Sequence, residues 1–329
     1  MTALLDRDTG RPAARRTLPG ADGLVWTVLR LHRTAMWVWT AYVAVTVGML
    51  LWLWGPGANA AQKAFDAFGY SGAQENAYRD GFSFLGFGGS FDSRFYGPSS
   101  LIGIASCAIA VFAAGPLIAR ELERGTAGLA WTQSVSPARW LTAKLAVPAV
   151  FVAVGTGLIV VLYRLVWNAH NHLLVAGIGP RSFAFSLGPA TVANALFGLA
   201  VGVLAALVLR RTLPALAAAG VVQFLAGAMR GNNWPFQHSP FSRLQPELPV
   251  FSKAITSTGA KVSDPGCYLS QKCLDRHHIT GFTRSYLPSP DYWPRQLAET
   301  GVLLGLTALA VAAAFLVLRR YQPKKETTA

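Results

Sequence analysis

The stretch at residues 118–144 reads IARELERGTAGLAWTQSVSPARWLTAK and lies between two long apolar segments. It begins with four charged residues within one and a half helical turns: Arg120, Glu121, Glu123 and Arg124. Opposite charges three residues apart support a solvent-exposed helical extension of the preceding apolar segment. The rest of the fold is predicted outward from this charge-dense insert.

The second half of the stretch predicts a bend and a new helix. Gly125 and Thr126 should end the helical extension, and Ser136 and Pro137 are a favourable N-cap and first-turn pair. The helix that begins there is expected to re-enter the apolar phase after Lys144. The stretch therefore predicts a rigid lever made of a helix, a bend, a short amphipathic piece and a membrane helix.

The composition of the whole chain is too apolar for an ordinary soluble domain. Its 329 residues are 52% hydrophobic and 13% charged, and the mean hydropathy is +0.36. Runs of about 18 or more apolar residues are candidates for membrane spans. Six such runs occur, at residues 35–54, 99–119, 145–167, 189–209, 212–229 and 297–318. The predicted fold is an all-α polytopic membrane protein with one six-helix transmembrane domain from residue 35 to residue 329.

The distribution of the net charge of +14 predicts the orientation of the chain. Sixteen of the 29 Lys and Arg residues lie in residues 1–34, in residues 118–144, at Arg210 and Arg211, and after residue 318. Basic residues accumulate in short cytoplasmic loops, so both termini are expected in the cytoplasm of a multi-pass plasma-membrane protein. Because these charges lie beside the spans, no nucleic-acid partner is expected.

Residues 1–34 are predicted to form a cytoplasmic tail and an interfacial helix. Residues 1–20 are rich in Arg, Pro, Thr and Gly and are expected to be disordered. Leu24 and Val28 then share one helical face, with Trp26 at the level of the headgroups. The alternative is a frayed extension of the first span. Since no cleavable signal peptide is apparent, the first span should also serve as the targeting signal.

A long outer segment, residues 230–296, is predicted before the last span. Cys267 and Cys273 stand six residues apart in it, and an oxidising outer compartment permits a disulfide between them. Two free thiols or a metal-binding pair are the alternatives. Cys107, inside the second span, is expected to be a small core residue.

Four polar residues are placed at membrane depth by these spans. Asn194 and Gln223 are expected to hydrogen-bond another helix or to face a translocation path. Arg164 lies near the outer end of the third span, where its side chain can reach the interface. Glu299, at the outer start of the sixth span, is its natural partner if the two helices are neighbours.

Two segments of the chain resemble a known family. The run ARELERGT, a small apolar run and then SPARWLTAK resemble the first intracellular loop of ATP-binding-cassette (ABC) exporter permeases of the second type. The actinobacterial members, with their familiar run ERGT followed by WTQSVS, look most like it. YLPSPDYWPRQ at residues 286–296 is similar to the segment before their last span.

The resemblance implies that the loop docks on a separate ATPase subunit. It also implies an N-terminal helix against the inner leaflet and a large outer segment before the sixth span. The docking residues that it implies are Arg120, Glu121, Glu123, Arg124, Gly125, Thr126, Trp131 and Arg139.

No catalytic or nucleotide-binding motif is found in the sequence. A Gly-x-x-x-x-Gly-Lys-Ser/Thr phosphate loop, a Gly-x-Ser-x-Gly elbow and a His-Glu-x-x-His helix are all missing. The His residues at 170, 172, 277 and 278 are not expected to bind a metal. The chain is therefore not expected to be an enzyme or to bind a cofactor directly, and ATP would be hydrolysed by a partner subunit.

Two functions follow from these observations. The leading hypothesis is the permease subunit of an ABC exporter that moves a small hydrophobic or amphiphilic substrate, such as a drug, an antibiotic or a lipid-like molecule. Six spans are few for a complete pathway, so a homodimer or a heterodimer with a second permease is expected, surrounded by membrane lipids. The alternative is a non-transporting membrane scaffold or sensor with an outer recognition segment.

Overall fold

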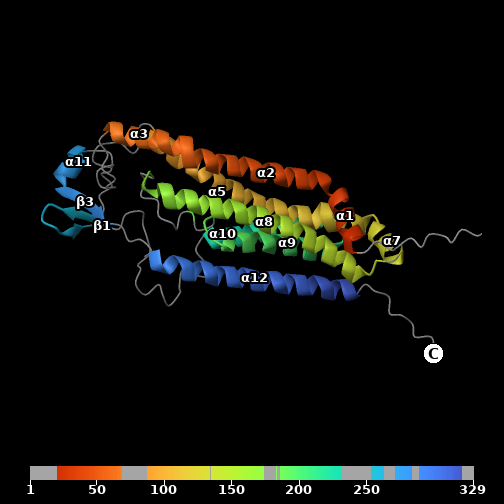
Figure 1. Cartoon of the computed structure of the whole chain (residues 1–329). Coiled ribbons are helices and arrows are strands. Elements are labelled where there is room, and N and C mark those ends of the chain that lie inside the picture. Colours follow the sequence, from red (N-terminus) through yellow and green to blue (C-terminus); the bar gives the residue numbers. More distant parts are fainter. Residues whose placement is uncertain are drawn as a thin grey trace, which may run out of the picture.

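The computed structural model is a bundle of long helices with a small sheet near one end (Figure 1). It describes residues 21–68, 87–133, 135–173, 183, 186–231, 253–262, 271–283 and 289–320. Six of the described helical segments are long and apolar enough to cross a membrane: Arg33–Ala64, Ser93–Glu123, Pro137–His170, Ala190–Leu209, Thr212–Arg230 and Tyr292–Arg320. The prediction of an all-α polytopic membrane protein with six spans is therefore confirmed.

The N-terminal half supplies the first three spans and the loop between the second and third. Its elements are α1 (Ala21–Leu31), α2 (Arg33–Trp52), the π turn η1 (Leu53–Gly57), α3 (Ala58–Phe68), α5 (Phe87–Phe112), the π turn η2 (Ala113–Ala119), α6 (Arg120–Glu123), α7 (Thr126–Gln133), α8 (Pro137–His170) and the 3₁₀ turn η3 (Asn171–Leu173).

The helices of the first two spans are longer than predicted. The spans predicted at residues 35–54 and 99–119 leave residues 55–98 as a connecting loop, but α3 continues to Phe68 and α5 begins at Phe87. Pro56 does not end the helix because it lies inside a π turn, whose wider hydrogen-bond pattern accommodates a residue without an N–H. Residues 69–86 lie outside the described residues.

The C-terminal half supplies the last three spans and a small sheet. Its elements are α9 (Ala190–Leu209), α10 (Thr212–Gly231), β1 (Lys253–Thr256), β2 (Lys261–Val262), α11 (Gln271–Arg276), β3 (Ile279–Thr283) and α12 (Ser289–Arg320). The strands pair antiparallel in the order β2-β1-β3.

The predicted outer segment at residues 230–296 is too long at its C-terminal end. The helix α12 already begins at Ser289, eight residues before the predicted start of the sixth span, with Pro290 in its first turn. Cys273, on α11, is disulfide-bonded, whereas Cys107 is free. Cys267 lies outside the described residues, so its pairing with Cys273 stays a prediction.

The central element of the bundle is α9. Within its apolar window 61% of the residues are buried, compared with 17% in the first and fifth spans. It packs against α5 with η2, and against α8, α10 and α12. Gly202 permits the closest of these approaches, since a Cβ there would lie 2.3 Å from the carbonyl oxygen of Ala110. The core is therefore built around a helix of small residues.

The two ends of the bundle differ in what they carry. The helices α1 and α7 lie at one end, together with the C-terminal end of α12 (Figure 1). The helix α3 and the strands lie at the opposite end (Figure 1). An even number of membrane crossings requires the first helix and the end of the last helix to lie on the same side, and α1 and the C-terminal end of α12 do so (Figure 1).

Candidate functional site

The loop between the second and third spans consists of α6, a bend and α7, and we call residues 120–133 the α6–α7 loop. Gly125 makes the bend with φ of +72°, in the left-handed region that favours glycine. Its N–H donates to the carbonyl of Leu122 at 3.2 Å, and the Thr126 hydroxyl donates to the carbonyl of Glu121 at 3.2 Å. The predicted break is present at Gly125, but Thr126 already begins α7, so the break covers Arg124 and Gly125.

The start of α8 also follows the prediction. The hydroxyl oxygen of Ser136 accepts a hydrogen bond from the N–H of Arg139 at 3.3 Å, and Pro137 occupies the first turn. Burial within the protein begins earlier than expected, at Trp140. The Trp131 ring packs edge-on against Trp140, with 5.6 Å between centroids, and so holds α7 against α8.

A buried lysine connects the loop to two other elements. Lys144 of α8 is 3% exposed, and its Nζ donates to Glu121 Oε1 at 2.5 Å, to the Leu117 carbonyl at 3.3 Å and to His32 Nε2 at 3.1 Å. These three acceptors match the three donors of an ammonium group, so the buried charge is fully hydrogen-bonded. We call His32, Glu121 and Lys144 the Lys144 triad; it joins the α1–α2 junction, α6 and α8.

His32 takes part in the triad as a neutral ring. Burial, and then the positive charge of Lys144, lower the pKa of His32 from 6.5 to about 4. The unprotonated Nε2 can therefore accept the hydrogen bond from Lys144 at neutral pH. The imidazole also lies edge-on to Phe112 of α5, with 5.8 Å between ring centroids.

The second carboxylate of α6 reaches a different helix. Glu123 Oε2 accepts from the backbone N–H of Thr212 at 3.0 Å and also from the Thr212 hydroxyl. Thr212 is the first residue of α10, where a negative charge interacts favourably with the helix dipole. The loop is thereby connected to the fifth span as well.

The opposite-charge pairs expected within the helical extension are not formed in the described part of the chain. Glu121 pairs with Lys144, and Glu123 bonds Thr212, instead of Arg120 or Arg124. The physical reason is that a buried ammonium and the free N–H of a helix start gain more from a carboxylate than exposed arginines do. Sequence reasoning missed the partners because His32, Lys144 and Thr212 lie 89, 23 and 89 residues away from these glutamates in the chain.

Most of the predicted docking residues are exposed on the surface, and one packs against α8. Six of them are exposed: Arg120, Glu123, Arg124, Gly125, Thr126 and Arg139. Trp131 is half-buried against Trp140, so it supports α7. Leu129, which the sequence did not single out, is 63% exposed on α7. The exposed face of the α6–α7 loop thus combines charges with an apolar side chain.

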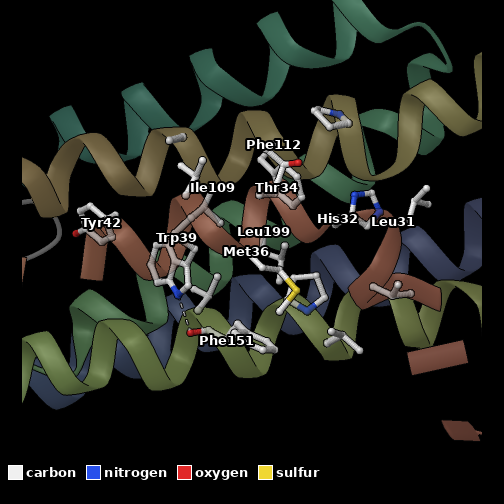
Figure 2. A pocket seen from close by; sticks show the side chains of 18 of the residues that line it. Leu31, His32, Thr34, Met36, Trp39, Tyr42, Ile109, Phe112, Phe151 and Leu199 are labelled. Carbon is white, nitrogen blue, oxygen red and sulfur yellow. Dashed lines mark hydrogen bonds between the residues drawn. The ribbon is translucent and has the colours of Figure 1, made fainter. Parts of the chain in front are cut away.

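A large apolar groove lies beside this loop, between α2, α5 and α8, and we call it the α2–α5 groove (Figure 2). Its volume is about 1060 Å³. The Trp39 indole N–H donates to the Phe151 carbonyl at 3.0 Å, which joins α2 to α8 along one wall (Figure 2). The lining is almost wholly apolar except at the loop end, where Arg120, Glu121 and Arg124 contribute.

Asn194 and Gln223 bond each other across the core. The Gln223 amide donates to Asn194 Oδ1 at 3.2 Å, linking α10 to α9, and the two residues are 1% and 5% exposed. Neither residue lines the α2–α5 groove. The expectation that they hydrogen-bond another helix is met by this pair.

Arg164 and Glu299 do not pair with each other. Glu299 forms an ion pair with Arg230 of α10, and the Arg164 guanidinium lies 4.7 Å from the centre of the Tyr292 ring. Trp293 is its second aromatic neighbour, at 5.5 Å. Because Glu299 pairs with Arg230, near the C-terminal end of α10, the sequence expectation for this pair is wrong.

The comparisons with known proteins agree with this architecture. No curated protein matches the chain. The family model described as "ABC-2 membrane transporter related" matches residues 40–230, which is more than half of the chain and includes the α6–α7 loop. The chain therefore belongs to the family of ABC-2 membrane transporter-related proteins.

Proposed function

We propose that this protein is the permease subunit of an ABC exporter and that a separate ATPase subunit docks on the α6–α7 loop. The observation that carries the proposal is that the exposed loop is bonded to two membrane helices and to the α1–α2 junction. Glu121 connects it to α8 and to the α1–α2 junction through Lys144, and Glu123 connects it to α10. A force applied to the loop would reach all of these helices.

The proposed orientation places the α6–α7 loop and both chain ends in the cytoplasm. Exposed basic residues at that end of the bundle support it: Arg120, Arg124, Arg139, Arg210, Arg211, Arg319 and Arg320. Such an excess favours the inner side of the plasma membrane. The ATPase would then find its docking surface on the side where ATP is present.

Two copies of the permease, or this chain with a second permease, would form the complete transporter. ATP binding and hydrolysis by the partner would move the α6–α7 loop, and the cavity between two six-helix halves would alternate in access. The large apolar groove supports a small hydrophobic or amphiphilic substrate. This chain would contribute the pathway and bind no nucleotide itself.

The test combines co-purification of the ATPase with ATP-dependent transport in vesicles. The informative variant is Arg124→Ala with Leu129→Ala, because both side chains are exposed and neither belongs to the Lys144 triad. We expect insertion and folding to be unchanged, with at least about tenfold weaker ATPase association, the effect of losing roughly 1.4 kcal/mol. Arg320→Ala, which removes a charge from the same end of the bundle, is the matched control.

Two results would contradict the proposal. One is unchanged co-purification and transport in the double variant. The other is no ATP-dependent transport with any co-expressed ATPase while the purified permease remains folded, which would instead favour a scaffold or sensor.

A further inference from the structure

The α2–α5 groove is large enough for a ligand and is open to the membrane. Its volume of about 1060 Å³ is at the upper end of the roughly 300–1,000 Å³ typical of small-molecule pockets. Val38 of α2 and Ile104 of α5 line it and are 65% and 67% exposed. These side chains stand at the mouth between α2 and α5, where the groove can admit a chain from the surrounding lipid.

The charge in the groove is confined to one end. Arg120 and Arg124 line that end, and neither forms an ion pair within the part of the chain that the structure describes. Glu121 is the only acidic residue among the lining residues, and Lys144 already neutralises it. His32 is neutral because of its low pKa of about 4. The nearest remaining carboxylate, Glu123, lies outside the lining, bonds Thr212 and interacts with Arg124 only through space. The end of the groove next to the α6–α7 loop therefore carries two arginines that are not ion-paired.

We propose that the α2–α5 groove binds an anionic membrane lipid from the leaflet on the side of the α6–α7 loop. Its acyl chain would lie along Leu101, Ile104 and Phe151, where burial of apolar surface stabilises it by about 25 cal/mol per Å². Its phosphate would lie at Arg120 and Arg124, because guanidinium groups bind phosphate oxygens in a bidentate manner. This binding requires neither ATP nor an ATPase, so it can be measured separately from transport.

A second copy of the chain is the less favourable occupant. Two copies inserted with the same orientation would bring Arg120 and Arg124 of each to the same depth in a symmetric contact through this groove. The facing like charges would oppose that contact, whereas they favour an anionic headgroup.

The test measures lipid binding to the purified full chain by native mass spectrometry. Phosphatidylglycerol and phosphatidylcholine with identical acyl chains are compared, so that only the headgroup charge differs. We expect the protein to bind phosphatidylglycerol about tenfold more tightly, an order-of-magnitude value for charge-assisted hydrogen bonds at a partly exposed site.

Two kinds of variant separate the headgroup from the tail. Arg120→Ala with Arg124→Ala should remove the preference and leave phosphatidylcholine binding unchanged, whereas Arg139→Ala, an exposed arginine outside the groove, should keep the preference. Ile104→Trp should weaken binding of both lipids by filling the groove. Val154→Trp is its matched control, since Val154 is also 67% exposed but does not line the groove.

Three results would overturn the proposal. Equal affinity of the unaltered protein for the two lipids would remove the role of the arginines. Equal effects of Ile104→Trp and Val154→Trp would place the lipid elsewhere. Conversion of a dimer into a folded monomer by Ile104→Trp, with lipid binding intact, would identify the groove as a contact between two copies.

Discussion

Lys144 is the residue through which the α6–α7 loop meets the membrane helices. A buried ammonium is costly unless it is paired, and Lys144 is satisfied by one carboxylate, one carbonyl and one neutral imidazole. Its side chain is 4% exposed and that of Glu121 is 18% exposed. Each charge of the pair therefore depends on the other for compensation.

Replacement of Lys144 by Met should destabilise the protein strongly. The Glu121 carboxylate would keep its partly buried position without a counter-charge, at a cost of about 3 kcal/mol in the free energy of unfolding. The melting temperature of the purified protein in detergent should fall by roughly 6–12 °C. Arg139→Met, on the exposed part of the same helix, should leave it unchanged.

The double variant Lys144→Met with Glu121→Gln distinguishes charge from shape. It removes both charges, so we expect it to recover more than half of the lost stability. If the single and double variants melt at the same temperature, the triad contributes packing and not charge compensation.

His32 should make the stability of the protein depend on pH. The unfolded imidazole has a pKa of 6.5 and the folded one about 4, so the unfolded state binds the extra proton between these values. Stability should be constant above pH 6.5 with respect to this group and should fall as the pH decreases from 6.5 to 4. The groups facing the imidazole are Lys144, Glu121 through Lys144, and the Phe112 ring.

Comparison with His32→Gln isolates this contribution, because a Gln amide oxygen can accept from Lys144 and does not titrate. The melting temperature of the unaltered protein should fall more steeply over that pH range than that of the variant. Parallel curves would show that His32 does not titrate on unfolding in this window.

At the scale of elements, the sequence predicts local features of the lever better than its contacts. The break at Gly125 and the cap at Ser136 follow from the conformational preferences of single residues, and both are present. The partners of Glu121 and Glu123 do not, because they depend on α8 and α10 each lying within reach of α6. The first helix also continues past the predicted end of its span at residue 54, because Pro56 lies in a π turn that does not end the helix.

The bend of the lever provides a prediction with an internal control. Gly125→Ala places a Cβ in the left-handed region, which costs about 1–2 kcal/mol, although no other atom lies within 4 Å of that Cβ. Gly128 lies three residues later in α7; its φ is not positive, and a Cβ there would contact no neighbouring side chain. Gly128→Ala should therefore be neutral or stabilise the protein by up to about 1 kcal/mol.

Melting temperatures of the two glycine variants are the measurement. We expect Gly125→Ala to melt below Gly128→Ala and to transport less, because the angle between α6 and α7 changes. Equal melting temperatures would indicate that the loop adopts a different bend in solution.

At the scale of the whole molecule, hydropathy was sufficient to predict the six spans. Six apolar runs predicted six spans, because each helix must present about 20 apolar residues to lipid. The small sheet was missed, since its strands are short and lie in a segment without a clear alternating pattern. The α2–α5 groove was missed as well, because a gap between helices has no signature in any one of them.

The central claim is that the α6–α7 loop faces the cytoplasm and is covered by an ATPase. It is tested most directly by thiol labelling of Leu129→Cys with a membrane-impermeant reagent, in a Cys107→Ser background. We predict labelling in inside-out vesicles, none in intact cells, and protection of the thiol when the ATPase is bound. Labelling of the thiol in intact cells, or equal labelling with and without the ATPase, would contradict the account.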